Sequence, residues 1–253
     1  MTALAPWLTF ILILARIMSM LVTAPLFGRR DIPQLPKLGL GMYLSLLTMT
    51  NVDTMFAGSN AAFIQALFAE VVGGLVVGLL ASWLLSSFAM GGQLMDQQAG
   101  FGTASVLDPG TATTVTLIGN LLLYVGLLLF LELNGHHLLI MGLMRSFALV
   151  PAGSLSLPFT LTEWAVHTLT ITTVLFLRLA MPLLAVIVIT DIALGMVGRA
   201  VPQLNVLMLG LPLKAGVALL LLGVLSPLFV ALGHDMVTHI EQGLGLLLGG
   251  MMP

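Results

Sequence analysis

Long, uninterrupted apolar runs constrain the fold of this chain more than any other feature of its sequence. A helix needs about 20 mostly apolar residues to cross the hydrocarbon core of a membrane. Six runs come close to or exceed that length, at residues 6–27, 38–56, 63–90, 115–133, 164–194 and 206–232. A further run at residues 138–150 is too short to span. The sequence therefore predicts an all-α membrane protein with six candidate spans.

Composition supports that class and excludes several others. Of the 253 residues, 59% are hydrophobic and only 7% are charged, whereas soluble domains have about 25% charged residues. The net charge of −2 offers no basic surface for nucleic acid. Because the chain has no cysteine, it has no disulfide framework, thiolate metal site or thiol nucleophile. The first run contains Arg16 and follows no basic stretch, which favours a retained helix over a cleaved signal peptide.

One polar segment stands out between two of the apolar runs. It reads GGQLMDQQAGFGTASVLDPGTATT, at residues 91–114, and contains neither lysine nor arginine. Its glycine, threonine and glutamine content predicts a long flexible loop. If the basic residues of the first and fifth connections face the cytoplasm, this loop is cytoplasmic as well. Cytoplasmic loops are expected to contain basic residues, and this one contains none. Either one apolar run is not a true span, or the chain does not thread the membrane in the usual alternating way.

Charged residues also occur inside the apolar runs, namely Arg16, Glu70, Glu132, Arg178 and Asp191. A lone charge at the bilayer centre costs about 2.5–3.5 kcal/mol on insertion scales, so such residues face protein or water. One interpretation is pairing of arginine with carboxylate, between helices or between subunits; the other is an ion or proton path. We favour pairing, because no segment places two carboxylates on one face as a relay would prefer. We expect Arg178 and Asp191 in particular to be buried against protein.

Glycine and proline spacing gives two further expectations. The segments GLVVG, with Gly74 and Gly78, and GLLLG, with Gly245 and Gly249, have the small-residue spacing that lets helices approach closely. We expect helices that pack on other helices. Pro33 and the nearby Pro36 predict that residues 28–37 form an extended connection between the first two apolar segments.

Motifs for catalysis or metal binding are weak. His136 and His137 are adjacent, and Glu132 precedes them by about one helical turn, but no HExxH motif occurs. Capping or hydrogen-bonding histidines at a membrane edge are the favoured interpretation, so no metal site is predicted. The serine-hydrolase motif G-x-S-x-G is also absent from the sequence. We therefore expect no enzymatic activity and no cofactor.

Five segments between or beside the apolar runs resemble, in order, the signatures of one known family. They read TAPLFGRRDIPQLPKLGLG (23–41), GQLMDQQAGFGTASVLDP (92–109), LNGHHLLI (133–140), SFALVPAG (146–153) and VPQLNVLMLGLPLK (201–214). The chain resembles the FliR family of flagellar export-gate proteins and its relatives in virulence type III secretion. No single segment is diagnostic, but five in this order across nearly the whole chain are specific. The segment GFGTASVLDP is more similar to the flagellar branch.

The resemblance implies an architecture and a set of partners. In this family one FliR copy joins FliP-like and FliQ-like subunits in a helical export gate, and it resembles a FliP and a FliQ fused end to end. The assembly belongs to the bacterial inner membrane at the flagellar basal body, where helical hairpins bury apolar faces on neighbouring subunits. An FlhB-like subunit, unfolded flagellar proteins and membrane lipid are the other implied partners. We expect one such domain over residues 1–253.

The resemblance also implies a role for the polar segment, because a FliR loop helps to close the family's pore. The matching candidate gate loop here consists of Gly100, Phe101, Gly102, Thr103, Ala104, Ser105, Val106, Leu107, Asp108 and Pro109. Glycine and small polar residues suit a plug that packs when closed and moves when a substrate arrives. Asp108 and Pro109 begin a rigid turn that would anchor one end. An ordinary extramembrane connector is the alternative, and Phe101 is either a stopper or a core anchor.

Two classes of function stay open on the residues alone. The favoured one is a non-enzymatic channel subunit for flagellar protein export, with a virulence-secretion homologue as a close variant. The other is a secondary transporter with a midplane site made by broken helices and buried charges. A transporter of that kind would need related halves, and residues 1–126 and 127–253 show no convincing repeat.

Overall fold

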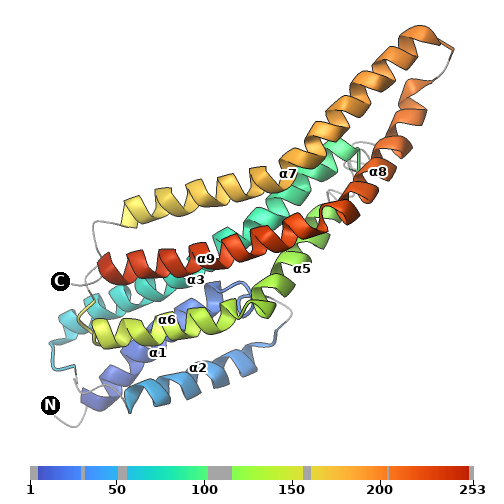
Figure 1. Cartoon of the computed structure of the whole chain (residues 1–253). Helices are drawn as coiled ribbons and strands as arrows, with labels where there is room; N and C mark the ends of the chain where they lie inside the picture. Colours follow the sequence, from blue (N-terminus) through green and yellow to red (C-terminus); the bar gives the residue numbers. More distant parts are fainter. Residues whose placement is uncertain are drawn as a thin grey trace. The chain divides into compact units, whose positions relative to one another are not determined.

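The computed structural model describes residues 5–29, 32–50, 56–101, 116–155, 161–203 and 205–250. Every regular element within these ranges is a helix, as Figure 1 shows. The helices are α1 (Ala5–Thr23), α2 (Gln34–Met49), α3 (Asn60–Ala99), α5 (Leu117–Glu132), α6 (Gly135–Leu149), α7 (Leu161–Ala200), α8 (Val206–Val224) and α9 (Ser226–Gly250). The predicted all-α class with membrane helices is confirmed.

The helix lengths correct the predicted number of spans. Among the described residues, only α1, α3 and α7 are each long and apolar enough to cross a membrane. The pairs α5 with α6 and α8 with α9 pass the same test only as bent pairs, which gives up to five spans rather than six. Helix α2 has only 16 residues, which is shorter than the about 20 that a bilayer crossing needs.

Backbone breaks explain why two apolar stretches are bent pairs. Asn134 separates α5 from α6 and has φ 56° and ψ 27°, in the left-handed region. Asparagine tolerates this region better than other residues with a side chain, so the helix stops there without a glycine. Leu225 separates α8 from α9, and the two helices are bent by 60° at that break. The short run at residues 138–150 forms most of α6, with Val150 as the C-cap of that helix.

The two prolines of the first connection act differently from each other. Pro33 is the N-cap of α2 and has an extended backbone, with φ −55° and ψ 150°. Pro36 lies in the first turn of α2, where its missing N–H would have no helical partner in any case. Helix α2 therefore begins directly after Pro33, and the expectation that Pro36 holds an extended connection is wrong. Lys37 Nζ donates to the Arg29 carbonyl oxygen at 2.7 Å.

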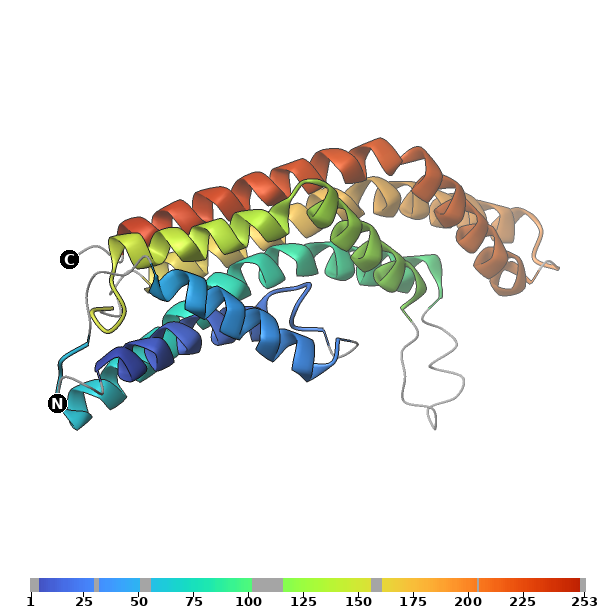
Figure 2. The same ribbon diagram turned by 90° about the horizontal axis from the view of Figure 1, so that it is seen from below.

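The helices form two compact units, each assembled from separate stretches of chain. Unit 1 comprises Met1–Leu84, Phe130–Thr170 and Val237–Pro253, and unit 2 comprises Leu85–Leu129 and Ile171–Met236. In unit 1, α1 and α2 lie side by side in both views (Figures 1 and 2). The α1 residues Leu12, Ile13 and Ile17 are fully buried. Helix α1 is therefore central to the packing of unit 1.

Two glycines let α1 and α3 approach closely in unit 1. A Cβ added at Gly74 would lie 2.0 Å from Ser19 Oγ, and one added at Gly78 would lie 2.0 Å from Thr23 Oγ1. Real Cβ atoms do not come this close to other atoms, so a larger residue at either position would push the helices apart. The predicted helix contact at GLVVG is confirmed.

Unit 2 has its own core and a large exposed apolar surface. Phe88, Ile118, Leu183 and Ile187 are almost completely buried. The end of α7 and the start of α8 form an antiparallel hairpin (Figures 1 and 2). Its exposed apolar side chains include Val188, Ile189, Met196, Met208 and Leu220. Such a surface is unusual for a soluble monomer and typical of a protein that contacts lipid or other subunits.

Candidate functional site

The polar segment at residues 91–114 begins as helix, so the prediction of a flexible loop over its whole length is wrong. Helix α3 continues to Ala99. Gly100 then adopts φ 87°, and the Phe101 N–H donates to the Asp96 carbonyl at 3.1 Å. A left-handed glycine followed by this bond is the Schellman ending of a helix. The candidate gate loop therefore starts where α3 ends.

The glycines before this ending serve close packing within unit 2. A Cβ added at Gly92 would lie 2.6 Å from the Cα of Gly119 in α5. One added at Gly91 would lie 2.6 Å from Leu179 Cδ2 in α7. Since backbone cannot move aside as easily as the end of a side chain, Gly92 is the more constrained of the two. Glycine is needed here for helix contact and not for loop mobility.

Asp96 connects the end of α3 to the start of α5. The residue is 2% exposed, and its Oδ1 and Oδ2 accept hydrogen bonds from the N–H groups of Ile118 and Gly119, both at 2.9 Å. The first N–H groups of a helix lack partners within the helix, and the helix dipole favours a negative charge at that end. Asp96 therefore holds Phe101 through its carbonyl oxygen and α5 through its carboxylate.

Of the candidate gate loop, the structure describes Gly100 and Phe101, while residues 102–109 lie outside the described residues. Phe101 is half-buried. Sequence reasoning missed Asp96, because it assigned the whole segment to a loop. The signal was present: Gly92 and Asp96 are four residues apart, the spacing of one helix face.

Arg16 and Glu70, two of the charges predicted inside apolar runs, form an ion pair in unit 1. Their side chains are 1% and 0% exposed. Arg16 Nη1 also donates to Ser146 Oγ at 3.1 Å and to the Val150 carbonyl at 3.3 Å. The guanidinium carbon lies 4.3 Å from the ring centroid of Phe147, in a cation–π contact. The arginine therefore contacts both α3 and the end of α6.

The other oxygen of Glu70 continues this network. Glu70 Oε1 accepts a hydrogen bond from the Gly153 N–H at 2.8 Å. Gly153 has φ 89°, which favours glycine, and lies in the turn that follows α6. A buried carboxylate needs such partners because its desolvation is costly. The Arg16–Glu70 pair thus connects α1, α3 and the chain after α6.

Comparison with known proteins gives the family. Residues 7–240 match the bacterial export proteins, family 1. The chain belongs to this family. It is 32% identical over 243 residues to the flagellar biosynthetic protein FliR of Bacillus subtilis (strain 168), covering 94% of each chain. It is 30% identical over 223 residues to that of Aquifex aeolicus (strain VF5), covering 87% of this chain and 86% of the relative.

A virulence-secretion relative also matches. The Yop proteins translocation protein T of Yersinia pestis is 28% identical over 226 residues, covering 86% of this chain and 85% of the relative. Together with the apolar helices, these relationships make the chain a membrane component of a flagellar or type III protein export apparatus. The resemblance inferred from the five ordered segments is confirmed.

The remaining predicted charges of this export protein are exposed in the isolated chain. Arg178 Nη1 lies 3.7 Å from Asp235 Oδ2, and the two side chains are 62% and 49% exposed. Asp191 pairs with Lys214, with side chains 44% and 21% exposed. Glu132 is also exposed. The packing of these charges against other subunits stays a prediction.

The paired histidines do not form a metal-binding group with other residues in the described ranges. His136 and His137 have ring centroids 6.2 Å apart, with ring planes at 83°. No group of three or more histidines or carboxylates in the described part of this export protein is placed to hold a metal ion. The two rings point differently, as expected for neighbours on a helix.

Proposed function

We propose that this export protein is a non-enzymatic subunit of the flagellar export gate, and that it forms part of the pore and its closing loop. Its partners are FliP-like, FliQ-like and FlhB-like subunits, membrane lipid and unfolded flagellar proteins. It works in the bacterial inner membrane at the flagellar basal body, as a single FliP- and FliQ-like fused domain over residues 1–253. The FliR relatives at 32% and 30% identity support the flagellar branch.

The observation that supports the closing loop is the anchoring by Asp96 within unit 2. The Asp96 carbonyl accepts the Phe101 N–H, and its carboxylate accepts two N–H groups at the start of α5. Both ends of the intervening chain are thereby held to α3. A plug that must return to one closed position benefits from fixed ends. The entropic cost of ordering a loop is smaller when its two ends are already held together.

The chemistry of the loop agrees with this role. A conduit for unfolded polypeptides needs a lining without strong charges, since a fixed charge would retain oppositely charged substrates. Residues 100–107 read GFGTASVL and contain no charged residue. Gly100, Gly102 and the small residues 103–105 let the segment pack in the closed state and move when a substrate arrives.

The test combines a leak assay with an export assay. Deletion of residues 103–107 in the chain, produced with its export apparatus, should make the membrane permeable to small solutes while the complex still assembles. Replacement of the same residues by a glycine–serine segment of equal length controls for loop length. A deletion complex that assembles normally and leaks no more than the intact complex would contradict the gate assignment.

We also infer that the charges Arg16, Glu70, Glu132, Arg178 and Asp191 serve subunit packing. Arg16 and Glu70 act indirectly, because they fix the helices of unit 1 on which neighbours would pack. Arg178 and Asp191 act directly, since their exposed ion pairs lie on apolar helices that would otherwise face lipid. An ion pair exposed to hydrocarbon is costly, which favours a protein neighbour there.

A further inference from the structure

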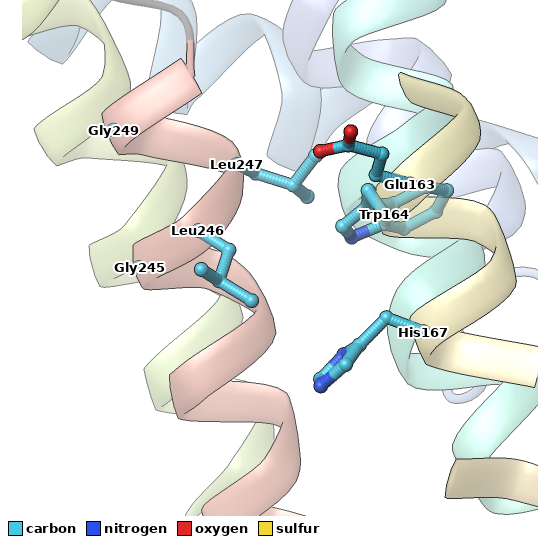
Figure 3. Close-up of a pocket in the computed structure, with 7 residues that line it drawn as sticks. All are labelled: Glu163, Trp164, His167, Gly245, Leu246, Leu247 and Gly249. Atoms are coloured by element: carbon cyan, nitrogen blue, oxygen red, sulfur yellow. The ribbon is translucent and has the colours of Figure 1, made fainter. Parts of the chain in front are cut away.

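Three cavities of similar volume, about 500–580 Å³, lie within unit 1 and differ in the charge of their lining. The first lies between α7 and α9, with Glu163 and His167 on one side and Gly245 and Gly249 on the other (Figure 3). An added Cβ at either glycine would meet nothing within 4 Å, so GLLLG makes no close helix contact in the described part of the chain. The second, near the start of α3, has no charged group among the described residues that line it. The third, between α1 and α2, is lined by Lys37, so among these three it is the cavity that suits an anionic ligand.

The third cavity, which we call the α1–α2 pocket, combines apolar and polar lining residues. Its polar lining residues are Gln34 and Lys37, and its apolar ones include Leu21, Val22 and Leu38. Val22 is 59% exposed and Leu38 is 44% exposed. A hydrocarbon chain in the pocket would remove this apolar surface from water. The pocket therefore fits a ligand that has an anionic end and an apolar chain.

Lys37 gives the pocket a positive charge that the described part of the chain does not neutralise. Its Nζ donates to the Arg29 carbonyl oxygen at 2.7 Å, whereas an ammonium group has three donors. No carboxylate pairs with Lys37 among the described residues. Because a carbonyl oxygen is neutral, the charge of Lys37 stays available to attract a phosphate group.

The position of the pocket along the chain favours a lipid over a free anion. Helix α1, which ends at Thr23, is long and apolar enough to cross a membrane. Residues 29–37, which follow it, contain three of the chain's eight lysine and arginine residues and one acidic residue. Basic residues directly after a membrane span lie at the level of the lipid headgroups, where they attract anionic lipids. The apolar lining residues of α1 then lie on the side of the acyl chains.

We propose that the α1–α2 pocket binds one anionic phospholipid. The phosphate lies beside Lys37 Nζ, and one acyl chain covers Val22 and Leu38. This inference rests on one part of the proposed function, contact with membrane lipid, and requires neither the closing loop nor the flagellar branch. It gives that contact a place in the fold, a headgroup charge and a stoichiometry.

The test counts bound lipids by native mass spectrometry of the full chain, purified and delipidated in mild detergent. Phosphatidylglycerol should give one adduct per chain that is tighter than any further ones, and phosphatidylcholine with the same acyl chains should bind more weakly. Lys37→Gln should raise the Kd for phosphatidylglycerol about fivefold, the effect of one basic residue near an anionic surface. Lys37→Arg keeps the charge and should bind as the unsubstituted chain does. Val22→Trp fills the apolar part of the pocket and should raise the Kd about tenfold, the effect of losing about two buried methylene groups.

Two matched variants separate the pocket from general effects. Arg145→Gln removes an exposed basic residue elsewhere in unit 1, and Val166→Trp adds the same bulk at another valine that is 59% exposed. Both should bind phosphatidylglycerol as tightly as the unsubstituted chain. Without lipid, Lys37→Gln and Val22→Trp should melt at the same temperature as the unsubstituted chain, which shows that they fold. Added phosphatidylglycerol should raise the melting temperature of the unsubstituted chain more than that of either variant.

Three results of the binding experiment overturn the inference. Equal affinities for phosphatidylglycerol and phosphatidylcholine would show that the pocket does not select an anionic headgroup. Inorganic phosphate that competes as well as phosphatidylglycerol would show an anion site without an acyl chain. Lys37→Gln and Val22→Trp that bind as tightly as their matched controls would place the lipid elsewhere. None of these results affects the leak and export assays of the closing loop, so the proposed function would stay intact.

A crosslinking experiment tests for a protein in the pocket instead of a lipid. The photoreactive residue p-benzoylphenylalanine replaces Leu38 in the full chain, which is produced in cells with its export apparatus. Irradiation should attach phospholipid to this position, because Leu38 lines the pocket. An adduct with a protein and none with phospholipid would assign the pocket to a subunit contact and overturn the inference.

Discussion

Arg16 and Glu70 form an ion pair inside unit 1, and neither side chain is accessible to solvent. The pair is also bonded to the end of α6 and to the turn that follows it. Its contribution is therefore mainly to fix the arrangement of α1, α3 and α6. Removing one partner would leave a buried charge without compensation, which is worse than removing both.

This asymmetry gives the first prediction. Arg16→Met alone and Glu70→Leu alone should each destabilise the chain by about 3–5 kcal/mol, whereas the double variant should recover much of that loss. Thermal unfolding of the purified protein in detergent measures all three. Arg178→Met, at an exposed ion pair, is the control and should have little effect. A double variant as unstable as the sum of the single variants would contradict the pairing argument.

The second prediction concerns Asp96. Asp96→Ala removes both acceptors for the Ile118 and Gly119 N–H groups, so the start of α5 should open more often. The free energy of unfolding should fall by about 0.5–2 kcal/mol, as it does when other helix caps are lost. Hydrogen–deuterium exchange of the peptide that contains residues 117–120 should become faster. Asp96→Asn keeps one acceptor and should give a smaller change. Asp235→Asn, at an exposed carboxylate, is the control and should leave this exchange unchanged. Equal exchange rates for Asp96→Ala and Asp235→Asn would show that Asp96 does not anchor α5.

The third prediction concerns the contact between α3 and α5. Gly92→Ala forces a Cβ against the backbone of Gly119, and overpacking of this kind costs about 1–3 kcal/mol. The melting temperature should fall. Gly195→Ala is the matched control in α7, where an added Cβ meets no atom, and alanine there should be neutral or stabilise by up to about 1 kcal/mol. Equal melting temperatures for the two variants would show that α3 and α5 are not packed this closely.

The fourth prediction addresses the exposed charge at Arg178. Arg178→Leu should change the stability of the isolated chain by no more than about 1 kcal/mol, because exposed ion pairs contribute little. The yield of the assembled export complex should nevertheless fall if Arg178 packs against another subunit. Copurification with the other subunits measures this. Arg199→Leu, at the end of α7 and outside the apolar runs, is the control; an equal yield for both variants would place Arg178 outside any subunit contact.

Domain organisation illustrates a limit of sequence reasoning. The absence of a polar linker predicted one domain, and the structure contains two compact units. Each unit is built from discontinuous stretches, and α3, α5, α7 and α9 contribute residues to both. The boundaries between the units fall inside these helices, so the composition of the chain has no boundary to reveal. Whether the two units act as one export-gate domain stays a prediction.

The sequence by itself determined the helical membrane class, the family and the close helix contact at Gly74 and Gly78. Apolar content, run length and the order of short segments are local properties, so they can be read directly from the chain. Helix ends were harder to predict from the sequence, because helices that are apolar on every side have little periodicity to mark where they stop.

Only the tertiary structure decided which polar groups are partners. Glu70 is 54 residues from Arg16 in the sequence. Asp96 is 22 residues from Ile118, whose N–H donates a hydrogen bond to its carboxylate. The sequence identified Arg16 and Glu70 as costly charges but could not pair them, and it assigned Asp96 to a loop. A buried polar group is stabilised by whichever partner the fold brings within hydrogen-bonding distance. That partner depends on how the helices pack and not on sequence spacing.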